Sequence, residues 1–131
     1  VKWMIENSKK TDFKIYFGAS PCVPATPFET SGAVLGVKEI ETLLQKKEIL
    51  YLSEVMNFPG VINGDKEILS KIEIAKKYNK KIDGHAPALR GEELDKYISV
   101  GIDTDHEAFS YAEAKEKIKK GMKILIREGS A

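Results

Sequence analysis

The 131-residue sequence has only one cysteine, Cys22, so it lacks the pair that an internal disulfide requires. A lone cysteine is typical of proteins from a reducing compartment, which favours a cytoplasmic location. No apolar run approaches the roughly 20 residues that span a bilayer, and the start, VKWMIENSKK, has no apolar signal core. We therefore expect no membrane among the partners of this protein.

The sequence also lacks an excess of either charge, because 21 Lys and Arg face 20 Asp and Glu. No basic stretch is interleaved with aromatic residues. This balance gives no electrostatic reason to expect nucleic acid as a partner. A glycine-rich phosphate loop is missing after the first expected strand, which argues against dinucleotide-binding and P-loop proteins.

Strand-like and helix-like segments alternate along the whole chain, which is long enough for one domain. Runs rich in Ile, Leu, Val or Tyr predict strands, and apolar residues at helical spacing predict helices. The expected strands cover 12–20, 48–56, 80–86, 102–109 and 122–131. The expected helices cover 1–10, 37–47, 63–79, 91–101 and 110–121, and the proline-rich segment 21–32 is expected to be a loop.

This alternation predicts an α/β fold with about five parallel strands joined by helical crossovers. Two architectures fit it: an open doubly wound sheet of flavodoxin-like topology, and part of a (β/α)8 TIM-type barrel. Polar residues stand where four of the strands end, at Ser20, Glu54, His85 and His106. A barrel gathers such residues at one mouth, whereas an open sheet concentrates them at one switch point. We therefore favour a partial barrel.

The acid Glu54 and the only two histidines, His85 and His106, form a candidate metal site. Each has an ordinary structural alternative, since Glu54 could pair with a loop lysine and each histidine could be satisfied within the core. Together they offer one carboxylate and two imidazoles, the usual ligands of Zn²⁺, Mn²⁺ and Fe²⁺. By residue type, the sequence predicts a divalent metal at the barrel mouth.

Acids beside the histidines are candidates for supporting roles. Asp83, Asp105 and Glu107 are placed to orient an imidazole N–H or to move a proton. We take Asp105 and Glu107 as the candidate catalytic acids within this chain. Cys22 lacks a local signature for a catalytic thiol, and the lysine-rich helix faces are interpreted as solvated surface.

Four longer strings resemble the adenine deaminases of the metal-dependent amidohydrolase superfamily. They are SPCVPATPFETSGA, SEVMNFPGVI, DGHAPALRGEELDKYISVGIDTDHE and GMKILIREGSA, in order along nearly the whole chain. The resemblance implies an incomplete or distorted (β/α)8 barrel that carries a pair of divalent metals, commonly Mn or Fe, with Zn as a further option. It also implies hydrolysis of adenine to hypoxanthine and ammonia by a metal-activated hydroxide.

Residue by residue, the resemblance implies that Glu54 is the carboxylate bridging the metals and that His85 and His106 are ligands. Residues 1–131 would then form a fragment of the catalytic domain that covers barrel strands three to seven. The His-x-His pair of the family's first strand and the proton-transferring aspartate of its eighth have no counterpart here. We therefore expect the chain alone to be a poor or inactive deaminase.

The remaining expectations concern substrate and partners. The loop 21–28 and the segment 56–60 are expected to form walls of an apolar purine slot. A fragment with open sheet edges invites pairing with a second copy, so a homo-oligomer is expected. Two other functions stay open: a different cyclic amidohydrolase, and a non-catalytic assembly domain with an open α/β fold.

Overall fold

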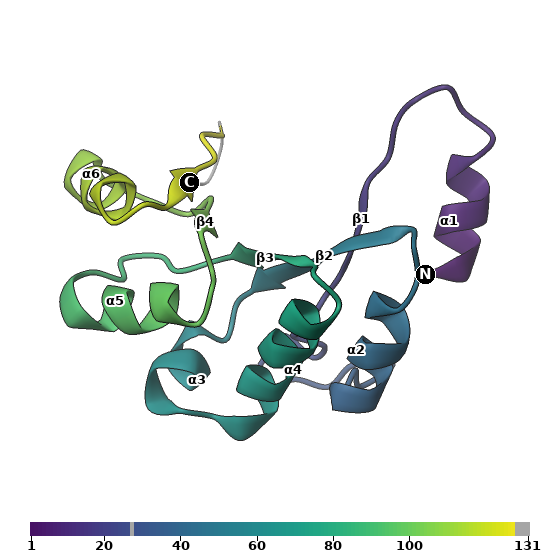
Figure 1. The fold of residues 1–131 in the computed structure, drawn as a ribbon, viewed down its shortest axis with the longest axis horizontal. Coiled ribbons are helices and arrows are strands. Elements are labelled where there is room, and N and C mark those ends of the chain that lie inside the picture. Colours follow the sequence, from purple (N-terminus) through teal and green to yellow (C-terminus); the bar gives the residue numbers. More distant parts are fainter. Residues whose placement is uncertain (27, 128–131) are drawn as a thin grey trace.

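In the computed structural model, which describes residues 1–26 and 28–127, parallel strands alternate with helices along the chain (Figure 1). The fold class expected from the sequence, α/β with five parallel strands, is confirmed. The strands are β1 (Phe17–Ala19), β2 (Ile49–Val55), β3 (Lys81–Gly84), β4 (Thr104–Asp105) and β5 (Lys123–Ile124). The helices are α1 (Lys2–Ser8), α2 (Val37–Leu44), α3 (Phe58–Asn63), α4 (Lys66–Lys77), α5 (Gly91–Ser99) and α6 (Tyr111–Lys119).

The strands form two parallel ladders, β1-β2-β3 and β4-β5. Side-chain and backbone contacts join them at one point: the Gly84 N–H donates to Thr104 Oγ1 at 2.9 Å, and that hydroxyl donates to Asp83 Oδ1 at 2.6 Å. A Cβ on Gly84 would overlap the carbonyl oxygen of Thr104, so only glycine permits this approach. The five strands therefore follow one another across the molecule as part of a barrel.

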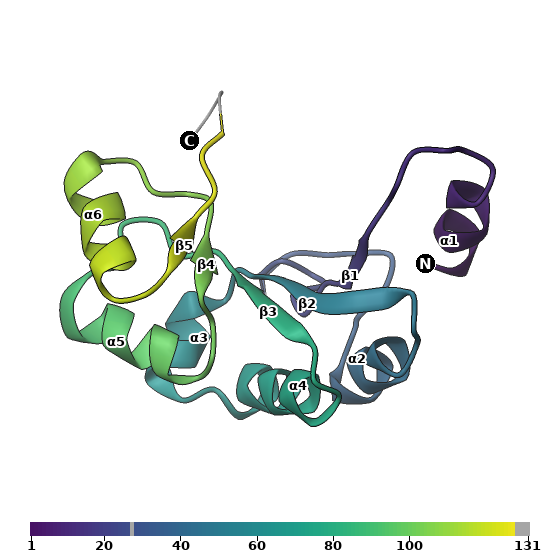
Figure 2. The same ribbon diagram turned by 45° about the horizontal axis from the view of Figure 1, so that its top comes forward.

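The core lies between the strands and one layer of helices. Figure 2 shows α2, α4 and α5 on one side of the strands, while α1 stands apart on an arm. Apolar side chains from the central strand and from two helices fill this layer. They include Ile49, Leu52, Val55, Ile40, Leu44, Ile72 and Ala75, all fully buried.

Several elements are shorter than the sequence predicts. The expected strand 12–20 is reduced to β1, because β1 has a ladder partner on one side only and pairs with the β2 residues Ile49–Leu52. Only Thr104–Asp105 of the expected strand 102–109 pairs with a neighbour. The expected strand 122–131 contains β5, and its residues 128–131 lie outside the described part of the chain, as does residue 27 of the loop 21–28.

One helix is missing from the sequence-based prediction. The segment between the expected strand 48–56 and the expected helix 63–79, for which no element is predicted, contains α3, whose first turn holds Pro59 and is capped by the Asn57 side chain, which accepts from the Gly60 N–H at 2.9 Å. Gly64, with φ +77°, ends it. Asp65 then caps α4. None of the helices in the described ranges is long and apolar enough to cross a membrane.

Candidate metal centre

Three potential ligand atoms from three strand ends meet at one point. Glu54 Oε1 lies 3.3 Å from His85 Nδ1 and 3.2 Å from His106 Nε2, and the two ring nitrogens are 3.4 Å apart. Among the described residues, these three are the group of His, Cys, Asp and Glu side chains whose spacing suits a metal ion. Ser20, the fourth polar residue at a strand end, is half-buried after β1 and takes no part in these contacts.

The backbone of β2 turns Glu54 toward the histidines. The ladder between β2 and β3 is irregular between Leu52 and Val55, and Glu54 has a φ of +38°. A positive φ is costly for a residue with a side chain and persists only where the surroundings hold it. Here the Met56 N–H donates to the Glu54 carbonyl at 2.8 Å, which closes a tight turn. The strained residue is thus the one that carries the candidate carboxylate ligand.

Tyr97 of α5 connects the strand end that carries Glu54 with the one that carries His85. Its buried hydroxyl donates to the Val55 carbonyl at 3.0 Å and accepts from the His85 N–H at 2.9 Å. Burial raises the pKa of Tyr97 above that of an exposed phenol. The hydroxyl therefore keeps the proton that it donates across the strand ends.

The acids beside the histidines are engaged in contacts of their own. Asp105 is fully buried and accepts from the Ala86 N–H at 3.1 Å, the Glu107 N–H at 3.2 Å and Lys117 Nζ at 2.5 Å. Burial alone would raise its pKa, but the bonds from Lys117 and Ala86 outweigh that and lower it, so Asp105 stays ionised. Glu107 accepts from Arg127. Asp83 accepts from the Thr104 hydroxyl.

Comparison with known proteins assigns the chain to a family. Residues 1–129 match the sequence model of the Amidohydrolase family. The chain belongs to the amidohydrolase family. The partial barrel and the superfamily resemblance expected from the sequence are thereby confirmed.

Relatives of this amidohydrolase chain carry a common name. An adenine deaminase of Sulfurovum sp. (strain NBC37-1) is 70% identical over 131 residues, which is 100% of this chain and 25% of that protein. Adenine deaminases of Methanosarcina mazei and Borreliella burgdorferi are 59% and 56% identical over 131 and 133 residues, each across 100% of this chain and 24% of the relative. The chain thus spans about a quarter of the length of the curated relatives that it matches.

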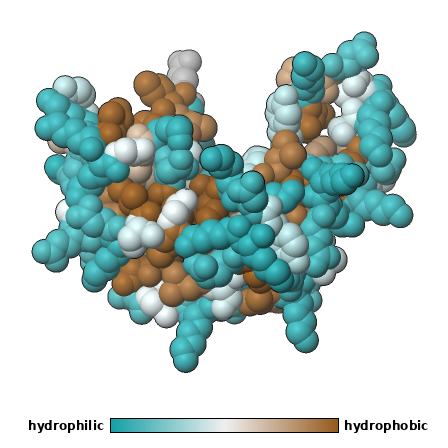
Figure 3. Space-filling view, viewed as in Figure 1, coloured by the Kyte–Doolittle hydropathy of each residue, from teal (hydrophilic) through white to brown (hydrophobic). Residues whose placement is uncertain are grey.

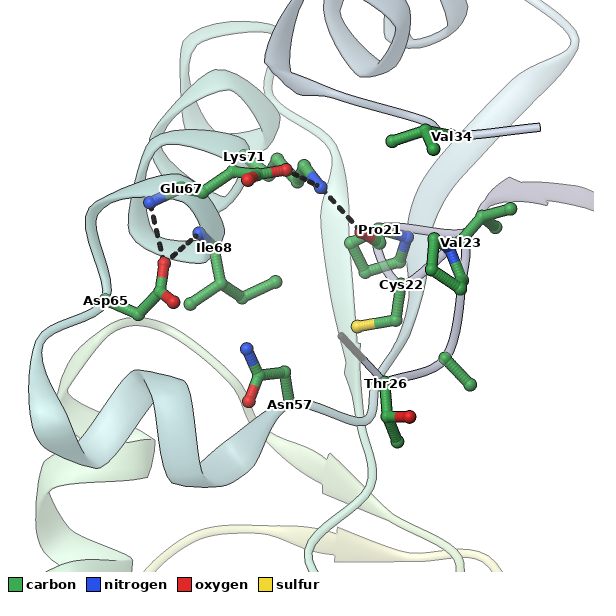
Figure 4. Close-up of a pocket in the computed structure, with 12 residues that line it drawn as sticks. Pro21, Cys22, Val23, Thr26, Val34, Asn57, Asp65, Glu67, Ile68 and Lys71 are labelled. Atoms are coloured by element: carbon green, nitrogen blue, oxygen red, sulfur yellow. Dashed lines mark hydrogen bonds and ion pairs between the residues drawn. The ribbon is translucent and has the colours of Figure 1, made fainter. Parts of the chain in front are cut away.

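A pocket of about 210 Å³ lies beside the strand ends of this amidohydrolase (Figure 4). It is lined by the loop that holds Cys22, by Asn57 and by Ile68 near the start of α4. The proline-rich loop lines this cavity with residues 21–26, the segment 56–60 contributes Asn57, and Glu54, His85 and His106 are not among the residues that line it. Burial raises the pKa of the Cys22 thiol, although backbone N–H groups of Asn57 and Met56 partly offset this. A protonated thiol is a weak nucleophile, which argues against a catalytic role for Cys22.

The interpretation of the lysine-rich faces as solvated surface is wrong for two lysines. Lys117 of α6 and Lys71 of α4 are buried, and Lys71 Nζ donates to the Pro21 carbonyl at 2.9 Å and pairs with Glu67 at 2.7 Å. No pattern in the sequence singles out Lys117. In the structure the isoleucine of the segment 110–121, Ile118, is exposed, and the buried residues of α6 are Glu113 and Lys117.

Proposed function

We propose that this chain is part of an adenine deaminase, a hydrolase that converts adenine to hypoxanthine and ammonia. The observation that carries the proposal is the convergence of one carboxylate and two imidazoles, from Glu54, His85 and His106, at one rim of a parallel sheet. The relatives' names support adenine as the substrate. In this proposal residues 1–131 supply barrel strands three to seven of the catalytic domain.

The three residues fit a divalent metal in spacing and in chemistry. Two ligands about 2.1 Å from a tetrahedral metal lie about 3.4 Å apart, and the three donor atoms here are separated by 3.2 to 3.4 Å. Two nitrogens and one oxygen suit Mn, Fe or Zn. We propose Mn or Fe on the resemblance to adenine deaminases, and a second ion of the pair would need ligands from outside this chain.

The residues of this chain have separate parts in the proposed reaction. A divalent metal supplies hydroxide near neutral pH by lowering the pKa of bound water. Glu54 has a side chain that is 42% exposed, so its carboxylate borders the open side from which a substrate would approach. We propose that the loop 21–26 and the segment 56–60, of which Asn57 lines the cavity, provide walls for a flat purine ring.

Asp105 and Glu107 differ in what their contacts allow. The carboxylate of Asp105 is occupied by two backbone N–H groups and an ammonium, which favours holding the loop of His106 over passing a proton to a substrate. Glu107 is less enclosed and pairs with Arg127. We therefore propose Glu107 as the better proton carrier within this chain, and expect the main proton transfer to depend on residues outside it.

A graft tests the proposal directly. The 131 residues replace the matching segment of the Sulfurovum adenine deaminase, and ammonia and hypoxanthine are measured from adenine with Mn²⁺ added. We expect the graft to deaminate adenine and the isolated chain to be poor or inactive. In the graft, Glu54→Gln should lower metal content and turnover by more than about 100-fold, because changes outside the ligand set alone cost about 10- to 100-fold.

A matched control is Glu48→Gln, which removes the same charge from an exposed position just before β2 and should leave both readouts unchanged. A graft that binds metal but acts only on other cyclic amidines or amides would favour a different amidohydrolase. A folded graft without metal would contradict the proposed site and favour an assembly domain. We further propose a cytoplasmic homo-oligomer.

A further inference from the structure

A cluster of three buried charges lies beneath the two histidine loops. Lys117 and Asp105 are fully buried, and Glu113 is 3% exposed. Lys117 Nζ donates to Asp105 Oδ2 at 2.5 Å, to Glu113 Oε1 at 2.6 Å and to the Ala86 carbonyl at 2.6 Å. An ammonium has three protons, so each one finds an acceptor here.

The cluster forms hydrogen bonds with the backbone of the loop that follows His85. Ala86, the next residue, is held at both of its backbone groups, because its carbonyl accepts from Lys117 and its N–H donates to Asp105. Ala88 donates its N–H to Glu113 Oε1 at 2.9 Å and has a φ of +61°. A positive φ in alanine is unfavourable, so this bond stabilises a loop conformation that the sequence alone would not prefer.

The same cluster also forms hydrogen bonds with the backbone of the loop that carries His106. Asp105 precedes His106 and also accepts from the Glu107 N–H at 3.2 Å. Glu113 Oε2 accepts from the Phe109 N–H at 3.1 Å. Residues on both sides of His106 are therefore attached to the groups that hold the loop of His85.

Stability alone does not account for this arrangement. Two carboxylates and one ammonium carry a net negative charge out of water, and burying such charges costs free energy that apolar packing would not. What the charges provide is a fixed link between two loops, since Lys117 bonds to the neighbour of each histidine. The two ring nitrogens stand 3.4 Å apart at the end of that link.

We propose that Lys117 is a positioning residue that sets the separation of His85 and His106, and through it the metal affinity of the site. The inference rests on the proposed function in taking these histidines as ligands. Lys117 does not touch the ligand atoms in the structure; it acts through Asp105 and through the backbone of Ala86. Orienting groups behind a ligand set typically change metal affinity by about 10- to 100-fold.

The test is a Co²⁺ titration of the 131-residue chain, read by the visible absorption of the bound ion, with the folded fraction followed by circular dichroism. Lys117→Met should weaken Co²⁺ binding by about 10- to 100-fold and alter the absorption band. Lys71→Met is the matched control. Lys71 is also a buried lysine bonded to a carbonyl and a glutamate, but its partners, Pro21 and Glu67, do not belong to the histidine loops. It should keep the wild-type affinity.

If Lys117→Met does not fold, Glu113→Gln is the variant used for the Co²⁺ titration. It keeps the shape of the side chain and removes one buried charge, so it should fold and still weaken Co²⁺ binding, because its bonds to Ala88 and Phe109 lose their ionic character. Folded variants at Lys117 or Glu113 that bind Co²⁺ as the wild type does would overturn the inference and leave the metal site standing. Wild-type binding that His85→Ala does not reduce would instead contradict the proposed site itself.

Discussion

Buried polar side chains decide where the candidate ligands stand. Tyr97 joins the strand ends of Glu54 and His85, and Lys117 joins the loops of His85 and His106. In both cases one buried side chain of a helix, Tyr97 of α5 or Lys117 of α6, forms hydrogen bonds with backbone groups next to the candidate ligands. The three ligand positions are thus connected in pairs by residues that carry no ligand atom.

Replacing Tyr97 by Phe tests the first of these connections. The change removes only the hydroxyl, so the Val55 carbonyl and the His85 N–H each lose a buried hydrogen-bond partner. We expect the free energy of unfolding to fall by about 1–3 kcal/mol, the cost of unpaired buried polar groups. Urea denaturation of the 131-residue chain measures it.

Tyr78→Phe provides the comparison for this experiment. Its hydroxyl bonds to Glu41 at 3.0 Å and Gln45 at 2.9 Å near the surface, where water replaces a lost partner. We expect a change within about 0.5 kcal/mol. If the free energy of unfolding falls equally in the two variants, the Tyr97 hydrogen bonds contribute no more to stability than those of Tyr78.

The candidate ligands were predictable from the sequence, but the residues that hold them were not. Glu54, His85 and His106 each follow an apolar run, and parallel strands bring such positions to one rim, so their convergence follows from the strand pattern. Lys117 gave no such signal, because a lysine on a helix is normally solvated. Its burial depends on contacts with residues up to 31 positions away.

At the scale of helices and strands, prediction succeeded where side-chain periodicity is strong and failed where local chemistry decides. The segments of α2 and α5 show clear apolar spacing, and both helices begin at the predicted residue. The short α3 was missed, because a proline and a glycine at its start indicate a loop by composition. Its six residues are instead fixed by the Asn57 cap and by Gly64 at its end. Strand ends were overestimated, since pairing partners and not composition limit a strand.

The cap of α4 gives a prediction at this scale. Asp65 accepts from the N–H groups of Glu67 at 2.8 Å and Ile68 at 3.2 Å, which are otherwise unpaired in the first turn of a helix. We expect Asp65→Ala to lower the free energy of unfolding by about 0.5–2 kcal/mol. Thermal and urea unfolding of the chain measure the loss.

Ser70→Ala is the control on the same helix. Ser70 bonds to the Lys66 carbonyl at 2.7 Å from an exposed position inside the helix, where alanine is the better helix former. This variant should be as stable as the wild type or slightly more so. A cap that matters no more than Ser70 would show that packing alone, not capping, fixes where α4 begins.

At the scale of the whole molecule, one side of the sheet is covered and the other is open. Helices pack against the first side (Figure 2). On the other side Tyr51 of β2 and Leu125, which follows β5, line an open, shallow hollow. Figure 3 shows apolar residues in brown on the body and on the arm that carries α1, with a notch between them. In a complete barrel, further strands would cover such a face. The chain is therefore left with apolar surface that its own residues do not bury.

The exposed apolar surface of the open face and of the arm predicts that the isolated chain associates with itself. The arm exposes Trp3 by 70% and Phe13 by 76%, and exposed aromatic side chains favour contact with another molecule. We expect sedimentation velocity to show dimers or larger species at micromolar concentration. Replacing Trp3 and Phe13 together by Ser should shift the chain to monomer without unfolding it, because both side chains face solvent.

Tyr111→Ser, at a residue 79% exposed on α6, should leave the association unchanged. A wild-type chain that sediments as a monomer would contradict the expected homo-oligomer. Monomers produced only by Tyr111→Ser would place the contact at α6 and not on the arm.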